Sequence, residues 1–135
     1  MFLRTHAAVV RVLEREVEDQ SGLPLSWYDV LLELNAADQG RLRMRELTER
    51  VVLSRTRVSR LVDEMARAGM VEKLSDPADG RATFAVVTDR GRTALREVAP
   101  VYLRGIQEHF VRHLRPAELE AIRVGLQQVL AAQIR

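Results

Sequence analysis

Residues 54–69 read SRTRVSRLVDEMARAG and form the most clearly patterned stretch of the chain. Ser54 is a preferred N-cap residue, and Gly69 suits the left-handed position just past a helix end. Apolar side chains recur at helical spacing between these two residues and fall on one stripe: Val58, Leu61, Val62 and Met65. The pattern predicts a helix that buries one face.

The opposite face of this helix is polar and basic. At 100° per residue, Thr56 and Arg60 lie opposite the apolar stripe. Arg57 and Ser59 flank them within the first two turns. An arginine can bond both acceptors of a guanine, and a threonine methyl can contact a thymine methyl. The outward residues are therefore of the types that read base edges.

The elements around this helix indicate a winged helix-turn-helix. We expect helices over 2–19, 26–34 and 45–51, a turn at 35–40, a long helix from 89 to about 114, and a last helix from Pro116. Pro100 should kink or interrupt the long helix. Residues 70–75 and 82–88 have strand character around a polar loop, and so predict a β-hairpin. Thr88 is expected to cap the helix that follows. The predicted fold class is mainly α with a small β-hairpin wing.

Composition limits the class of protein. A chain of 135 residues suggests one domain, and 47% hydrophobic with 30% charged residues indicates a folded one. The absence of cysteine excludes disulfides, thiolate metal sites and thiol redox chemistry. No apolar run is long enough for a membrane span, and no secretory leader is recognised. We expect a soluble cytoplasmic protein with no membrane partner.

Positive charge is concentrated in one part of the chain. Residues 41–60 hold seven Arg against two Glu, a balance of +5, whereas residues 21–40 hold three acidic residues and no Lys or Arg. Such a cluster is typical of a surface that binds a polyanion. Arg81, beside Gly80 in the wing loop, has the position of a side chain that enters a narrow DNA minor groove. Asp79 is expected to orient Arg81 through an ion pair.

Three stretches resemble the MarR family of bacterial transcription regulators. They are LPLSWYDVLLEL (23–34), MRELTERVVLSRTRVSRLVDEMARAGMVEK (44–73) and DPADGRATFAVVTDRG (76–91). The resemblance implies a homodimer joined by N- and C-terminal helices (1–22 and 93–135), around a winged-helix core (25–92). It implies specific binding of double-stranded DNA at a pseudo-palindromic operator, with repression as the expected outcome. The implied DNA contacts are Ser54, Arg55, Thr56, Arg57, Ser59, Arg60, Arg81 and, on charge and proximity alone, Arg43.

The last helix gives an independent reason to expect a dimer. Its apolar side chains have little of their own chain left to cover them: Leu126, Val129, Leu130 and Ile134. A monomer would expose them as a patch, and a twofold dimer is the commonest way to bury one.

A small-molecule effector and a metal ion are two further candidate ligands. Many relatives of the resembled family release DNA when an aromatic ligand binds. Here the candidate ligand contacts are His6, Trp27 and Tyr28, with an aromatic carboxylate as the hypothetical ligand; packing of the two aromatic rings is the favoured alternative. His109 and His113 are spaced to share one helix face, but two histidines without a third ligand make a weak metal site. We expect no cofactor.

Other classes of protein fit less well. The chain shows no phosphate-binding glycine loop, nucleophile elbow or His-Glu metal motif, so we expect no enzyme. A protein-binding winged helix would present exposed apolar anchors rather than outward arginines. The remaining alternative is an architectural DNA-binding protein without sequence preference or ligand response.

Overall fold

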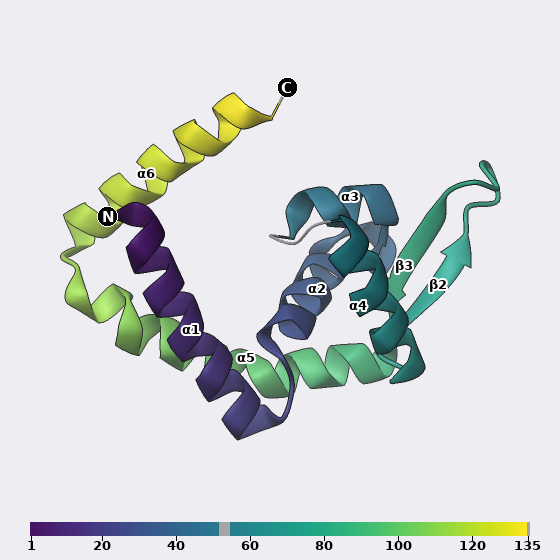
Figure 1. Cartoon of the computed structure of the whole chain (residues 1–135), viewed down its shortest axis with the longest axis horizontal. Helices are drawn as coiled ribbons and strands as arrows, with labels where there is room; N and C mark the ends of the chain where they lie inside the picture. Colours follow the sequence, from purple (N-terminus) through teal and green to yellow (C-terminus); the bar gives the residue numbers. More distant parts are fainter. Residues whose placement is uncertain (52–54, 135) are drawn as a thin grey trace.

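The structure is a computed structural model that describes residues 1–51 and 55–134, with only the backbone of Arg55. Its elements in chain order are α1 (Phe2–Ser21), α2 (Leu25–Ala36), η1 (Asp38–Gly40), β1 (Arg41–Arg43), α3 (Met44–Arg50), α4 (Arg55–Arg67), β2 (Val71–Ser75), β3 (Thr83–Val87), α5 (Asp89–His109), η2 (Val111–His113) and α6 (Pro116–Gln133). Elements α2 to β3 form one part, here called the winged lobe. Helices α1 and α6 lie at the other end of the long α5, and we call them the arm (Figure 1).

The winged lobe holds a three-stranded antiparallel sheet in the order β1-β3-β2. The predicted hairpin is present as β2 and β3, with Lys73 opposite Ala85. Strand β1 (Arg41–Arg43) is an addition to the predicted elements, which place no strand between the turn at 35–40 and the helix at 45–51. In β1, Leu42 lies opposite Ala85. A three-residue segment with two arginines has no strand pattern of its own, and only its pairing with the distant β3 makes it a strand.

The core of the lobe is closed by α2, α3, α4 and the sheet. The predicted stripe of α4 is confirmed: Val58, Val62 and Met65 are fully buried, and Leu61 is half-buried. Leu34 and Leu47 are fully buried from the neighbouring helices. Because the apolar stripe of α4 is buried in the core of the lobe, the opposite face of this helix is exposed to solvent.

The base of the wing is tied to the helices on either side. Gly69 ends α4 in the predicted left-handed conformation, with φ 78°. The Thr88 hydroxyl accepts a hydrogen bond from the Gly91 N–H at 3.0 Å and donates one to the Gly69 carbonyl at 2.7 Å. A methyl group on Gly91 would lie 2.2 Å from the carbonyl oxygen of Met70, so only glycine allows this close approach. The predicted cap at Thr88 is confirmed.

Helix α5 is shorter than predicted and is not interrupted. It runs through Pro100 and ends at His109 rather than near Leu114. Pro100 is exposed, so water can reach the carbonyl that loses its intrahelical partner. Beyond His109 the chain forms the short 3-10 helix η2.

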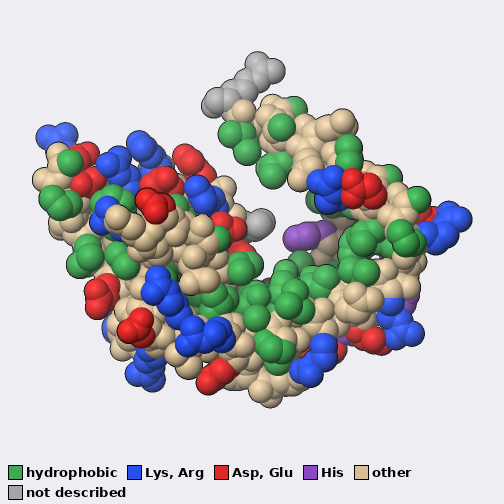
Figure 2. Space-filling model, turned by 180° about the vertical axis from the view of Figure 1, so that it is seen from behind, with side chains coloured by type: hydrophobic (Ala, Val, Ile, Leu, Met, Phe, Trp, Pro, Cys, Tyr) green, Lys and Arg blue, Asp and Glu red, His purple; other side chains and the backbone are tan. Residues whose placement is uncertain are grey.

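The arm is incompletely covered by its own chain. Helix α1 packs on α5 through the buried Leu13 and Val17, and Glu16 lies 2.6 Å from the His109 ring nitrogen. None of the described side chains of α6 is buried. Figure 2 shows hydrophobic side chains along the hollow between the arm and the winged lobe. Within residues 1–51 and 55–134, no helix is long and apolar enough to cross a membrane.

Candidate nucleic-acid interface

The first turns of α4 carry the predicted DNA-facing residues on the exposed side. The side chains of Thr56, Arg57, Ser59 and Arg60 are all exposed, opposite the buried stripe. Ser54 lies outside the described residues, and of Arg55 only the placement in α4 is described. Burial of Val58 and Val62 thus orients a polar, basic surface toward solvent.

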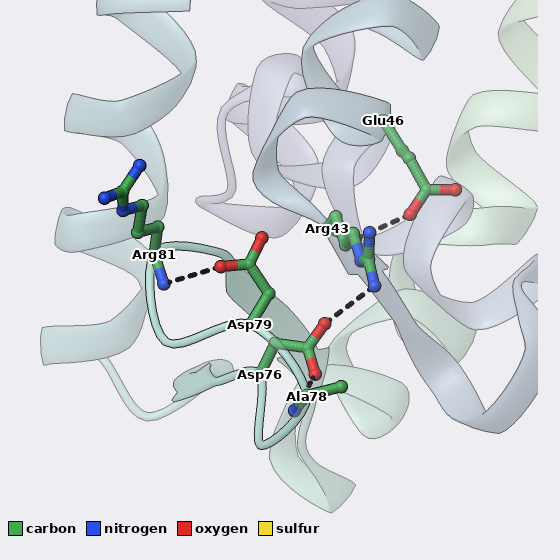
Figure 3. Close-up of polar contacts among 6 residues, drawn as sticks. All are labelled: Arg43, Glu46, Asp76, Ala78, Asp79 and Arg81. Atoms are coloured by element: carbon green, nitrogen blue, oxygen red, sulfur yellow. Dashed lines mark hydrogen bonds and ion pairs between the residues drawn. The ribbon is translucent and has the colours of Figure 1, made fainter.

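The wing loop is shaped by its aspartates. The Asp76 N–H donates to the Ala82 carbonyl at 2.9 Å, and the Ala82 N–H donates to the Asp79 carbonyl at 3.0 Å. The Asp79 carboxylate accepts the backbone N–H of Arg81 at 3.1 Å. The predicted ion pair between Asp79 and the Arg81 guanidinium was wrong: Asp79 holds the backbone of the turn, and the arginine side chain points away from it (Figure 3). Arg81 is exposed and projects from the loop.

A buried carboxylate joins β1 to the wing. Asp76 is only 5% exposed, and its Oδ2 lies 2.7 Å from Nη2 of Arg43. Its Oδ1 accepts the Ala78 N–H at 2.9 Å. The Arg43 guanidinium also lies 5.6 Å from the centre of the Phe84 ring. Arg43, predicted as a phosphate contact, therefore has a structural role in the wing, although its side chain stays 40% exposed.

The partner of Asp76 is not predictable from the sequence alone. Aspartate at the start of a turn is common, and only the sheet register brings it to Arg43, 33 residues earlier. Asp76 and Arg43 together are called the wing clamp below.

A groove of about 510 Å³ lies between α3, α4 and the wing. Its described lining is Arg43, Met44, Arg45, Thr48, Ser59, Lys73, Asp79, Arg81, Ala82 and Thr83. Four of these side chains are cationic and one is a carboxylate, so the lining is positive, although Arg43 is paired with the neighbouring Asp76. It brings together three predicted contacts, Arg43, Ser59 and Arg81.

Lys73 is a groove residue that sequence reasoning did not single out. Its Nζ lies 2.7 Å from Oδ1 of Asp63 on α4. The hydrogen bond from Lys73, together with its charge, lowers the pKa of Asp63 below its ordinary value. The pair links β2 to α4 and places Lys73 at the groove wall. The sequence feature that could have identified Lys73 is the alternation of side chains along β2. This alternation places Lys73 only once the pairing of β2 with β3 is known.

The residues predicted for an effector are divided by the structure. His6 and Tyr28 line a second pocket, of about 310 Å³, between α1, α2 and α5. Trp27 is not among the residues that line this pocket and packs, half-buried, against the core.

The expectation that His109 and His113 share a helix face was wrong, because α5 ends at His109 and His113 lies in η2. His109 lies against Glu16 instead. Within the described part of the chain, no group of three or more His, Cys, Asp or Glu side chains is placed to hold a metal ion.

Comparison with known proteins agrees with this geometry. Residues 21–82 match a family model described as MarR family. The chain is 27% identical, over 90 residues, to the uncharacterized HTH-type transcriptional regulator YkoM of Bacillus subtilis (strain 168); the match covers 67% of this chain and 58% of that relative.

Solved structures cover the chain more fully. Sco3205 of Streptomyces coelicolor, a MarR family transcriptional regulator in complex with DNA, is 25% identical with a TM-score of 0.89, covering 99% of this chain and 83% of that one. AbsC of Streptomyces coelicolor, also a MarR family transcriptional regulator, is 28% identical with a TM-score of 0.84, covering 97% of this chain and 90% of that one. The chain is similar to MarR family winged-helix transcriptional regulators, in sequence over residues 21–82 and in fold over nearly its whole length.

Proposed function

We propose that the chain is a transcriptional repressor that binds double-stranded DNA specifically, as a homodimer on a pseudo-palindromic operator. The observation that carries this proposal is the exposed basic face of α4 beside a cationic groove closed by the wing. In a helix-turn-helix, the first residues of the second helix contact base edges in the major groove. The side chains of Thr56, Arg57, Ser59 and Arg60 have this position, and Ser54 and Arg55 precede them in sequence. The exposed Arg81 is assigned to the adjacent minor groove.

The neighbours lend support. The solved relative Sco3205 is described in complex with DNA, and it superposes over 99% of this chain. The fold that it shares with nearly the whole of this chain is therefore one that binds DNA. That relationship favours DNA as the partner of the groove over a protein.

The proposal of a homodimer rests on exposed apolar side chains of α6 and α5. Leu126, Val129 and Leu130 of α6 are 43%, 60% and 61% exposed, and Leu103 of α5 is 61% exposed. A second copy related by a twofold axis would cover these side chains and present two recognition helices to successive turns of the major groove.

The competing function is an architectural DNA-binding protein without sequence preference. Such a protein relies on phosphate contacts, and its affinity falls steeply with salt on every duplex. The methyl group of Thr56 among the outward arginines favours readout of bases, because it can contact a thymine methyl and has no counterpart in phosphate binding.

The test is fluorescence anisotropy against the DNA upstream of the chain's own gene and against a scrambled duplex, over a salt series. Specific readout predicts a preference of about 10³ or more for the upstream DNA. We expect Arg60→Ala to lower that affinity about tenfold or more, while Arg96→Ala, which removes one exposed arginine from α5, leaves it near the wild-type value. Equal binding to both duplexes would favour the architectural function, and no binding at low salt would contradict both.

A further inference from the structure

The three-stranded sheet has a second face, which points away from the core of the winged lobe. Leu42 and Ala85 are 5% and 0% exposed and turn their side chains to the core. Lys73, opposite Ala85, reaches Asp63 on α4 from the same side. Because side chains alternate along a strand, the neighbours of these residues in sequence point the other way. We call the surface that they form the outer face of the sheet. It consists of Arg41 and Arg43 of β1, Glu72 and Leu74 of β2, and Phe84 and Val86 of β3.

The strand register orders the outer face into two rows. In one row, Val86 lies between Arg41 on β1 and Glu72 on β2. In the other row, Phe84 lies between Arg43 and Leu74. Residues directly opposite on antiparallel strands share one face and have neighbouring side chains. The outer face therefore has an apolar centre on β3, with arginines along the β1 edge and a carboxylate on the β2 edge.

The apolar centre is not covered by the described part of the chain. Leu74 is 46% exposed, and Phe84 and Val86 are half-buried. None of the three belongs to the core of the lobe or to the side chains packed against it. Figure 1 shows the hairpin of β2 and β3 at the end of the molecule opposite to α1 and α6, so the arm of the same copy does not reach this surface.

Two opposite charges on this face have no partner of opposite charge. Arg41 and Glu72 are both exposed, and within the described residues neither side chain makes a hydrogen bond or an ion pair. The Arg41 guanidinium lies over the Phe84 ring, 4.5 Å from its centre. Strands β1 and β2 are about 10 Å apart, because β3 runs between them. The charge of Arg43 differs, since Asp76 neutralises it in the wing clamp.

These charges select one way to stack two outer faces. Two sheets pack face to face about 10 Å apart, with their strands roughly aligned. A twofold axis parallel to β3 places β2 of each copy over β1 of the other, so that Glu72 meets Arg41 twice and Val86 meets Val86. A twofold axis across the strands would instead place β1 on β1, with Arg41 against Arg43. Charge complementarity therefore favours the axis parallel to β3.

We propose that the outer face of the sheet binds the outer face of a second copy, with Glu72 of each copy paired to Arg41 of the other around an apolar centre of Phe84 and Val86. Six side chains bury much less than the about 1,600 Å² of a standard interface, so the contact is weak in free solution. It gains strength where two dimers are held on neighbouring sites of one DNA duplex, because their effective concentration is then high. That role on DNA rests on the proposed function, but the contact between the sheets does not.

The first experiment is cross-linking without DNA. The chain has no cysteine, so single introduced cysteines report the contact directly. Val86→Cys lies on the proposed axis, and we expect a short bismaleimide to join two such chains at about 1 mM protein, where a weak contact is populated. Ser75→Cys is the matched control, because Ser75 is an exposed position of the same hairpin on its other face. This control should give few joined chains.

An exchange of charges tests the proposed pairing. In the Val86→Cys chain, Glu72→Arg should lower the joined fraction about fivefold or more, because arginine then meets arginine. Adding Arg41→Glu reverses both members of the pair and should restore most of the joined fraction. The melting temperature of each variant reports whether it is folded. Glu72→Arg lies at an exposed position and tests the pairing by itself if the Arg41→Glu chain does not fold.

The role on DNA has its own measurement. Gel shifts compare a duplex that carries the upstream site once with duplexes that carry it twice, over a series of spacings. We expect the wild type to fill the two sites cooperatively at one or more spacings. Glu72→Arg should lower the affinity for the second site about tenfold, relative to its affinity for the single site.

Three results would overturn the proposal: joining of Val86→Cys chains no greater than that of Ser75→Cys chains, the same joined fraction with and without Glu72→Arg, or a folded chain with exchanged charges that stays at the level of Glu72→Arg. Joining without any DNA binding contradicts only the proposed function. DNA binding without joining contradicts only the contact between the sheets, and joining with independent filling of the two sites contradicts only the role on DNA.

Discussion

The winged lobe and the arm differ in how they treat apolar surface. In the lobe, the stripe of α4 is fully buried at Val58, Val62 and Met65 by elements of the same chain. In the arm, α6 has no buried side chain among its described residues, and Leu130 is 61% exposed. The lobe covers its apolar stripe with its own chain, whereas the arm leaves apolar side chains of α6 exposed. Under the proposed function, DNA binding is the task of the lobe and dimerisation is the task of the arm.

The largest effect should come from charging the arm. We expect Leu126→Glu with Leu130→Glu, one helical turn apart on α6, to give a monomer of 15.4 kDa by light scattering. Affinity for the upstream DNA should fall about 100-fold or more, because two linked half-site contacts become independent. Circular dichroism should stay close to that of the wild type, since the core of the lobe does not involve α6.

The matched control for this pair places the same charges at the same spacing on the other side of the helix. Gln128→Glu with Ala132→Glu lies about 200° from the first pair around α6, and both positions are exposed. We expect this control to remain dimeric. A dimeric Leu126→Glu, Leu130→Glu variant would contradict the assignment of the arm as the interface.

A second feature of the lobe is a buried charge. In the lobe the carboxylate of Asp76 is buried and paired with Arg43, in the wing clamp. We expect Asp76→Ala to lower the free energy of unfolding by about 2 kcal/mol, because it removes charge-assisted hydrogen bonds and leaves Arg43 without its partner. Urea denaturation measures the change. In a double-mutant cycle, Arg43→Ala with Asp76→Ala should cost less than the sum of the two single changes.

Comparing variants of the two wing-clamp residues tests whether Arg43 contacts DNA directly. A phosphate contact predicts that Arg43→Ala lowers the salt slope of binding by about one, whereas Asp76→Ala leaves that slope unchanged. A purely structural role predicts that both variants weaken DNA binding alike. Arg41→Ala is the matched control, because Arg41 also lies over Phe84, at 4.5 Å from the ring centre, but has no ion pair with Asp76. Additive effects in the cycle would contradict the clamp.

The local pattern of the sequence was enough for the helices of the lobe. The stripe of α4, its left-handed end at Gly69 and the cap at Thr88 are short-range features, and each was confirmed. Failures came where distant segments meet. Strand β1 exists through its pairing with β3, and the partner of Arg43 is 33 residues away. The predicted exposure of Arg60 and Arg81 needed no such contact, which is why the basic face could be predicted and the clamp could not.

The pocket between α1, α2 and α5 also depends on contacts between residues that are distant in sequence. His6 and Tyr28 were singled out because of residue type, and both line it. Tyr102, from a helix 74 positions further along the chain, could not be paired with Tyr28 by any local pattern. Asp29, counted from the sequence only among the acidic residues of 21–40, gives the pocket its negative character together with Glu14.

Asp29 gives the smallest predicted effect and sharpens the contrast with Asp76. Burial and the charge of Glu33 raise its pKa above the ordinary value of 3.8, so the folded protein holds the proton to a higher pH than the unfolded chain does. Between these two pKa values the folded state binds more protons, and stability therefore falls as the pH rises through that interval. Above that pH interval, the charged Asp29 lowers the free energy of unfolding by its full amount. We expect Asp29→Asn to melt a few degrees higher than the wild type at pH 7, with the difference narrowing as the pH is lowered toward 4. Glu18→Gln, exposed on α1, should melt with the wild type at both values. A variant that melts lower at pH 7 would mean that Asp29 has a stabilising partner. The expected result would mean that the charged carboxylate of Asp29 lowers the stability of the fold. Residues that lower stability in this way are typical of binding sites.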